Sequence, residues 1–265
     1  MGLDTGLKKR KHGTQPRMLV VHMENHISID YMQDHEAIPN YQKEGPDAIA
    51  YKRNCFRLLA ECLCSSLSIS THLDIGCGSG YLVESMRDLG IQSFGAEIGY
   101  MYHHGLFPEV EPYIYESNIF QLGSIGKHFD LVSAMEVLEH LYAENFHKNE
   151  LNSAIISLIS ATNRYIFLTM PILNYSYCPW LDWNGRNPQL WPRILRPDEV
   201  PLNKDRTPIL GHVTLATEAW WRCKLESFGL LRLDKIEKRI NDHLHRIDPG
   251  LLEWWHIFIY EKRTK

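Results

Sequence analysis

The stretch Leu73-Asp74-Ile75-Gly76-Cys77-Gly78-Ser79-Gly80-Tyr81-Leu82 joins an apolar strand, a glycine-rich turn and the beginning of a helix. Its three alternate glycines remove the side chains that would keep a ligand away from the backbone, and they permit positive φ in the turn. The amides at the start of the following helix can then face the polar end of a ligand. The stretch therefore predicts one half of a nucleotide-type pocket at the carboxyl edge of a parallel sheet.

The spacing of these glycines separates two classes of nucleotide site. A dinucleotide-binding fingerprint reads G-x-G-x-x-G, and its third glycine would fall at Tyr81. The chain instead has D-x-G-x-G-x-G, with Asp74 at the end of the strand. A carboxylate at that position repels a pyrophosphate and suits a ligand that carries an amine and a sulfonium.

The residues after the turn continue an alternating strand and helix pattern. Apolar residues recur at helical spacing up to Leu89, and Gly90 is placed as a C-terminal stop. The next strand ends in Glu97, 21 residues after Gly76. This is close to the ~20-residue offset at which a strand-end acid binds ribose hydroxyls in such folds. Further apolar runs predict strands over 112–115, 129–135 and 164–170, with a helix over 151–159.

These motifs, in this order, resemble those of the class I S-adenosylmethionine-dependent methyltransferases over roughly residues 48–262. The resemblance implies a Rossmann-like α/β fold. In that fold a seven-stranded sheet, mostly parallel with an antiparallel closing strand, carries helices on both faces. The resemblance also implies S-adenosylmethionine as cofactor, with Asn118 where the family places a polar side chain on the adenine amine. The implied cofactor-binding residues are Asp74, Gly76, Cys77, Gly78, Gly80, Glu97, Ile98, Asn118, Ile119 and Met135.

The composition narrows the classes of function. Hydrophobic residues make up 44% of the chain and charged residues 23%, which are ordinary globular values. The net charge of −4 argues against a protein built to bind polyanions, although a local basic patch would still allow nucleic acid. No apolar run approaches the ~20 residues that span a bilayer, and no signal peptide is recognisable. The cysteines show no metal-type spacing and indicate reduced, buried thiols of a cytoplasmic protein: Cys55, Cys62, Cys64, Cys77, Cys178 and Cys223.

The chain divides into an N-terminal part and one large domain. We expect 1–47 to be a tail and an irregular segment, with the basic run at 8–11 solvated. Residues 48–265 are expected to form a single methyltransferase domain that opens with an amphipathic helix over 48–63. At its end we predict a helix over 214–228 and an antiparallel hairpin of strands over 230–236 and 254–260.

Residues 172–210 form an insertion rich in proline and aromatic side chains. Six prolines there forbid a regular helix. The aromatic side chains either stack on a planar acceptor or form a small satellite core. Because the segment after this strand overhangs the acceptor site in the resembling fold, we expect the insertion to act as a lid over the substrate.

The candidate catalytic residues directly follow the strand over 129–135. Glu136, Glu139 and His140 have the spacing i, i+3 and i+4, which would place them on one face of a helical turn at the mouth of the pocket. Such groups can remove the proton of an acceptor hydroxyl, with the histidine as general base. Alternatively, these three residues have a purely structural role and only form hydrogen bonds in the wall of the pocket.

The Glu-x-x-Glu-His pattern resembles two branches of the superfamily, whose domains are of types 11 and 12. One branch is the ubiquinone-biosynthesis O-methyltransferases. The other is the small-RNA 3′-terminal 2′-O-methyltransferases, in which two glutamates and two histidines hold magnesium against vicinal hydroxyls. By position, His212 would supply the second histidine beside Glu136, Glu139 and His140. Such a donor set would accept Mg²⁺, Mn²⁺ or Zn²⁺.

The leading prediction is an S-adenosylmethionine-dependent O-methyltransferase whose acceptor is a small molecule or a saccharide-like hydroxyl. The alternatives are a metal-assisted 2′-O-methyltransferase for a terminal ribose of RNA and a non-catalytic cofactor-binding partner subunit. N-methylation also stays open, because an amine needs less activation than a hydroxyl. The oligomeric state is not predicted.

Overall fold

A computed structural model describes the chain over residues 45–99, 101–143, 149–174, 176, 180–204, 206–247 and 256–263. The predicted tail and its basic run lie outside the described residues, apart from the last three positions of the segment 1–47. None of the described helices is long and apolar enough to cross a membrane.

Seven strands form one sheet with the order β3-β2-β1-β4-β5-β7-β6. Strand β7 runs antiparallel to both of its neighbours, and the other pairings are parallel. The predicted sheet with one antiparallel closing strand is therefore confirmed. The strands are β1 Thr71–Ile75, β2 Gln92–Glu97, β3 Ile114–Glu116, β4 Phe129–Met135, β5 Thr162–Met170, β6 Leu230–Arg232 and β7 His256–Lys262.

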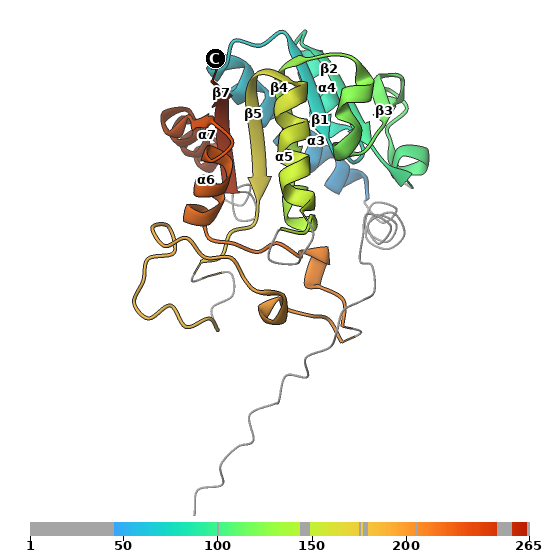
Figure 1. Cartoon of the computed structure of the whole chain (residues 1–265). Coiled ribbons are helices and arrows are strands. Elements are labelled where there is room, and N and C mark those ends of the chain that lie inside the picture. The colour runs from blue at the N-terminus through green and yellow to red at the C-terminus, as the bar shows by residue number, and fades with distance from the viewer. Residues whose placement is uncertain are drawn as a thin grey trace, which may run out of the picture.

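In the described part of the chain, five α-helices cover the two faces of the sheet (Figure 1). Buried residues of α5 and α6 share one core cluster with the sheet, and residues of α3, α4 and α7 share the other. Successive residues of β5 alternate between the two clusters, with Ile166 and Leu168 in one and Tyr165 and Phe167 in the other. The helices are α3 Pro46–Ser66, α4 Tyr81–Asp88, α5 Glu150–Ala161, α6 Glu218–Glu226 and α7 Asp234–Ile247.

The predicted antiparallel pairing of the two closing strands is confirmed, but the predicted extent of the first strand, over 230–236, was wrong. Strand β6 ends at Arg232, and the residues that follow form α7 instead of continuing the strand. The helix buries Ile240 and Leu244 against the sheet, four residues apart as on one helix face. The apolar run at 230–236 was too short to distinguish strand from helix by its period.

The insertion after β5 has little regular structure in its described part, as its prolines predict. Short 3₁₀ turns at Pro197–Glu199 and Ile209–Gly211 interrupt it. Trp183 is buried and meets Trp191 edge-on, at 6.3 Å between ring centroids. These two rings belong to a small cluster separate from the main core, which confirms the satellite core: Leu173, Leu181, Trp183, Trp191, Leu195, Val200 and Leu215. Trp180, in contrast, is 66% exposed.

The cysteines follow the predicted pattern with one exception. Cys55, Cys62 and Cys77 are buried and Cys64 is partly buried, and none of the four is in a disulfide bond within the described part of the chain. Cys223 is exposed on α6, and Cys178 lies outside the described residues.

Candidate cofactor and acceptor site

The glycine-rich turn follows β1 and lies against the residues that leave β4. Gly76, Gly78 and Gly80 all have positive φ, as the sequence predicts. A Cβ at Gly76 would lie 2.7 Å from Cγ2 of Val137, so only glycine lets the loop pack under the chain beyond β4. Gly80 precedes α4 and supplies no side-chain cap. The first amides of that helix therefore remain for a ligand or solvent.

Glu97 at the end of β2 turns its carboxylate back toward the turn. Its oxygens accept hydrogen bonds from the backbone amides of Gly78 at 2.6 Å and Ile98 at 2.9 Å. Burial nevertheless raises the pKa of Glu97 to about 7, against the opposing effect of these amides. A carboxylate in this position can accept hydrogen bonds from the hydroxyl groups of a ligand. This fits the predicted binding of ribose hydroxyls by Glu97.

Asp74 is buried at the end of β1 beside the same turn. Burial raises the pKa of its carboxyl to about 7, although a hydrogen bond from Ser133 favours the ionised form. The negative charge of Glu97 raises it further. Two desolvated carboxylates at one edge of the sheet match a ligand that brings both a positive charge and hydroxyl donors, as S-adenosylmethionine does.

The remaining predicted cofactor residues lie around this edge with different roles. The thiol of Cys77 packs into an apolar cluster with Val83, Val110 and Ile114, so only its backbone faces the turn. The Asn118 side chain accepts a hydrogen bond from the amide of Phe120 at 2.9 Å and caps the 3₁₀ helix Ile119–Ile125. Its contact with adenine stays a prediction, as do the contacts predicted for Ile98, Ile119 and Met135.

The arrangement of Glu136 differs from the predicted helical turn. Its φ of 54° places it in the left-handed region directly after β4, and only Leu138–His140 form a short 3₁₀ helix. Glu136 still lies beside Glu139 and Thr169, which favour its ionised form, while burial raises its pKa to about 7. The expectation of three polar groups on one helix face was therefore wrong, because the backbone changes hand at Glu136.

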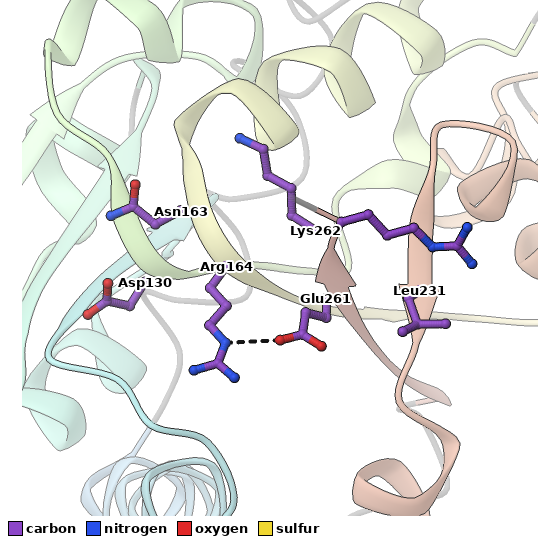
Figure 2. A pocket seen from close by; sticks show the side chains of 7 residues that line it. Asp130, Asn163, Arg164, Leu231, Glu261 and Lys262 are labelled. Carbon is purple, nitrogen blue, oxygen red and sulfur yellow. Dashed lines mark hydrogen bonds and ion pairs between the residues drawn. The ribbon is translucent and has the colours of Figure 1, made fainter. Parts of the chain in front are cut away.

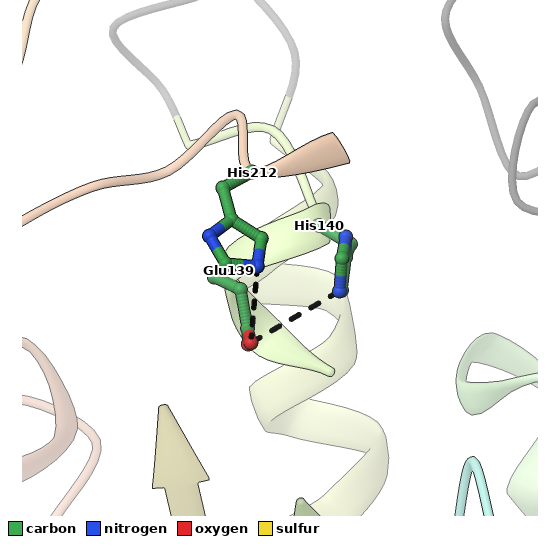
Figure 3. Close-up of side chains that lie close together, drawn as sticks. All are labelled: Glu139, His140 and His212. Carbon is green, nitrogen blue, oxygen red and sulfur yellow. Dashed lines mark ion pairs between the residues drawn. The ribbon is translucent and has the colours of Figure 1, made fainter. Parts of the chain in front are cut away.

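Glu139, His140 and His212 converge in one buried group (Figure 3). The Nε2 atoms of both histidines lie 4.0 Å from Oε1 of Glu139. The two rings meet edge-on with centroids 5.0 Å apart. Ligand atoms from the three residues all lie within 4.8 Å of one another. The structure thus brings together three of the four predicted metal ligands, and Glu136 is not part of this group.

Backbone hydrogen bonds bring His212 to this place from the far end of the insertion. The carbonyl oxygen of Glu139 accepts from the amides of Val213 and Thr214, both at 2.9 Å. The Thr214 hydroxyl donates to the carbonyl of Leu141 at 2.6 Å. These contacts attach the chain after the insertion to the 3₁₀ turn that carries Glu139 and His140.

Both histidines are held in the neutral form that metal ligation requires. Burial lowers the pKa of His140 to about 4, and burial together with the charge of His140 lowers that of His212 to about 3. Nδ1 of His140 lies 3.2 Å from the carbonyl oxygen of Gly211. A proton on Nδ1 would donate to that carbonyl and leave the lone pair of Nε2 on the side of Glu139.

A depression lies at the opposite edge of the sheet, where β4 and β5 begin (Figure 2). Its charged side chains already serve the fold, since Arg164 pairs with Glu261 at 2.9 Å. Lys262 donates to the carbonyl oxygens of Ile159 and Thr162 and so caps the end of α5. Because the glycine turn and the Glu139 group lie at the carboxyl edge, this depression is not part of their site.

Comparisons with known proteins agree with this fold. A family described as "Methyltransferase domain" matches residues 47–223. A ubiquinone biosynthesis O-methyltransferase of Chelativorans sp. (strain BNC1) is 29% identical over 171 residues, 57% of this chain and 66% of that protein. The protein of the same name from Dinoroseobacter shibae is 31% identical over 142 residues, 48% of this chain and 55% of its own length. The chain thus matches about half to two thirds of these relatives.

Among solved structures, the magnesium protoporphyrin IX methyltransferase of Synechocystis PCC 6803 with bound S-adenosylhomocysteine superimposes with a TM-score of 0.52. The match covers 88% of this chain and 97% of that one at 14% identity, so it supports the fold alone. The family match spans well over half of the chain. The chain therefore belongs to the methyltransferase-domain family, within the class I superfamily that uses S-adenosylmethionine as methyl donor.

Sequence reasoning missed several residues that shape this site. Ser133 and His72 stand behind Asp74, Thr169 lies beside Glu136, and Val137 closes over Gly76. Each is a side chain of a buried strand or of the residues that leave one. Their contacts depend on strand register and on packing between distant segments, which a single sequence does not contain.

Proposed function

We propose that this protein transfers a methyl group from S-adenosylmethionine to a hydroxyl of a small-molecule or saccharide-like acceptor, with a divalent cation held by Glu139, His140 and His212. The observation that carries the proposal is this buried donor group, which follows β4 at the same edge of the sheet as the glycine turn after β1. The names of the curated relatives support oxygen as the acceptor atom.

The donor group fits a cation in spacing and in charge. Two ligands that each lie about 2.0–2.2 Å from one ion can be at most about 4.4 Å apart. The 4.0 Å separations from Glu139 to the two histidines fall within that limit. One carboxylate and two neutral imidazoles accept Mg²⁺, Mn²⁺ or Zn²⁺. A cation held there lowers the pKa of a neighbouring hydroxyl and orients it.

Glu136 is the residue best suited to take the proton of the acceptor. Its pKa of about 7 is near the operating pH, where a general base is most effective. His140, with a pKa lowered to about 4, would be a weak base. In this proposal Glu136 accepts the proton, while the glycine turn, Asp74 and Glu97 hold the methyl donor, whose sulfonium already activates the transferred carbon.

Calorimetry with Mn²⁺ and methyl transfer to a panel of hydroxyl acceptors test the proposal together. We expect one Mn²⁺ site, and we expect chelation to abolish transfer to a catechol or a glycoside until Mg²⁺, Mn²⁺ or Zn²⁺ is returned. His212→Ala should weaken Mn²⁺ binding about 100-fold, since even outer-shell changes weaken metal sites 10–100-fold. His243→Ala, at an exposed position on α7, is the matched control. Full turnover both after chelation and in His212→Ala would remove the cation from the proposal.

A terminal ribose of RNA is a second candidate acceptor. The donor set around Glu139 contains three of the four residues that the resemblance assigns to the metal site of the RNA branch, and a ribose end offers vicinal hydroxyls. The net charge of −4 weighs against it. Short RNA with a 3′-terminal ribose, compared with the same RNA ending in a 2′-deoxyribose, distinguishes the two acceptors. Methylation of the first alone would favour RNA over the small molecule.

A further inference from the structure

A fully buried histidine stands behind the cofactor site and takes no part in the chemistry described above. His72 lies on β1 two residues before Asp74, so the two side chains lie on the same face of the sheet. Its Nδ1 lies 2.8 Å from the hydroxyl of Ser93 on β2, and its Nε2 lies 2.8 Å from the hydroxyl of Ser133 on β4. The Ser133 hydroxyl in turn donates to Oδ1 of Asp74. A continuous hydrogen-bonded row therefore crosses three strands and ends at the Asp74 carboxylate.

The number of protons on the serine hydroxyls and the histidine ring determines which group donates in each hydrogen bond of this row. A serine hydroxyl has one proton, and Ser133 gives its own to Asp74. Ser133 must then accept from His72, so Nε2 of His72 carries the ring proton. Nδ1 of the neutral ring accepts from Ser93. Burial keeps His72 neutral, with its pKa lowered to about 3.

The pairing of the strands holds each member of the row in place. His72 is in register with Ser93 between β1 and β2, and Asp74 is in register with Ser133 between β1 and β4. Ser133 thereby occupies Oδ1 of Asp74 and limits how the carboxylate can turn. The other oxygen, Oδ2, is the one that we assign to the ligand.

We propose that His72 is a positioning residue of the cofactor site, which acts through Ser133 to orient the Asp74 carboxylate toward the cationic methyl donor. This inference rests on the assignment of Asp74 to cofactor binding in the proposed function. The competing explanation is that the row only satisfies buried polar groups. In that case it would affect stability without a specific effect on cofactor affinity.

Two conservative variants of His72 separate these explanations. The side-chain amide of Gln can place an N–H near the position of Nε2, so His72→Gln retains a donor to Ser133. The shorter amide of Asn reaches only the position of Nδ1, so His72→Asn retains the partner of Ser93 and loses that of Ser133. Both variants replace the same buried ring, and urea denaturation should show similar losses of stability for the two.

Calorimetry of S-adenosylmethionine binding to the full chain is the deciding measurement. We expect His72→Asn and Ser133→Ala to weaken binding about 10-fold, as for the loss of one hydrogen bond to a charged group. His72→Gln should stay within about 3-fold of the natural protein. Ser133→Ala removes the single hydroxyl through which His72 would act, so normal binding in this variant overturns the inference even if a His72 variant does not fold.

The variant Asp74→Asn tests separately whether Asp74 binds the cofactor. Its result therefore distinguishes an error in the role of His72 from an error in the role of Asp74. If Asp74→Asn binds the donor as well as the natural protein, Asp74 is not a cofactor residue, and the inference fails with the assignment. If Asp74→Asn binds weakly while Ser133→Ala and His72→Asn bind normally, the assignment stands and the positioning role is overturned. Equal weakening by His72→Asn and His72→Gln also overturns it, since a lost donor to Ser133 would then not be the cause.

Discussion

Asp74 and Glu97 share an environment that disfavours their charged forms, and this predicts a pH dependence of cofactor binding. Burial raises the pKa of each to about 7, above the ~4 of an unfolded chain. The free native protein therefore keeps protons on these groups that the unfolded chain has lost. The contribution of these two groups to stability therefore falls as the pH rises from about 4 through 7.

A cationic donor favours the ionised carboxylates, so its binding should release protons. We expect the affinity for S-adenosylmethionine to rise between pH 5.5 and 7.5 and then to level off, because both groups are ionised above about 7. Calorimetry at pH 6.5 in two buffers of different ionisation enthalpy measures the released protons. Asp74→Asn should reduce their number. Binding heats that do not depend on the buffer would contradict the predicted coupling.

Individual residues differ in how far the sequence could reveal their roles. The glycines of the turn, Asp74 and Glu97 were recognisable because each belongs to a local pattern of strand, turn and offset. The backbone of Glu136 was not, since a φ of 54° at a residue other than glycine has no local signature. It depends on the packing of Val137 over the turn.

The N-terminus of helix α6 is attached to the insertion through the side chain of Thr217. The hydroxyl of Thr217 accepts from the amide of Trp220 and caps the helix. It also donates to the carbonyl of Trp191 at 2.7 Å and accepts from the amide of Arg193 at 2.9 Å. One buried side chain thus joins the start of α6 to the insertion.

We expect Thr217→Ala to lower the free energy of unfolding by about 2 kcal/mol, the upper range for the loss of a helix cap. Urea denaturation measures this change. Thr217→Ser keeps the hydroxyl and should recover most of the loss. Ser227→Ala at the exposed other end of α6 should change the stability by no more than about 0.5 kcal/mol. An equal loss in Thr217→Ser would show that the methyl group, and not the hydroxyl, is responsible.

Secondary structure was predictable where the period of apolar residues was long and clear. Strand β4 was predicted with its observed limits, and α3 and α5 within three residues at either end. Helix α7 was not predicted, because it begins within 230–236, a short apolar run whose environment, not its period, decides its conformation. The ion pairs of Arg232 with Glu218 and Glu237, at 2.8 and 2.9 Å, join β6 to α6 and α7 where the strand ends.

Across the whole molecule, the cofactor turn and the insertion are supported by different contacts. The hydrogen-bond partners of the turn include Ala96, Glu97 and Ser133 on β2 and β4. The insertion follows β5 and extends beyond the end of the sheet (Figure 1). Its apolar side chains pack against one another and against Leu215, which lies beyond the insertion. We propose that it acts as a lid over the acceptor, and this arrangement makes the proposal testable.

Replacing residues 176–206 by a short Gly-Ser linker should abolish methyl transfer to the acceptor. The affinity for S-adenosylmethionine should stay within about 3-fold, because no partner of the turn named above is removed. Calorimetry and the methyl-transfer assay measure the two effects on one variant. Loss of cofactor binding together with transfer would mean that the insertion supports the whole domain and is not a lid.

The order of motifs along the chain was enough to predict the class of fold, the position of the cofactor turn and the residue types around it. This is possible because strand, turn and helix patterns repeat over a few residues. The resemblance already placed His212 with Glu139 and His140. The tertiary structure decided that Glu136 lies outside the group that these three residues form and that His72 is hydrogen-bonded to Asp74 through Ser133. Those contacts depend on strand register and on backbone hydrogen bonds between distant segments, which no local period encodes.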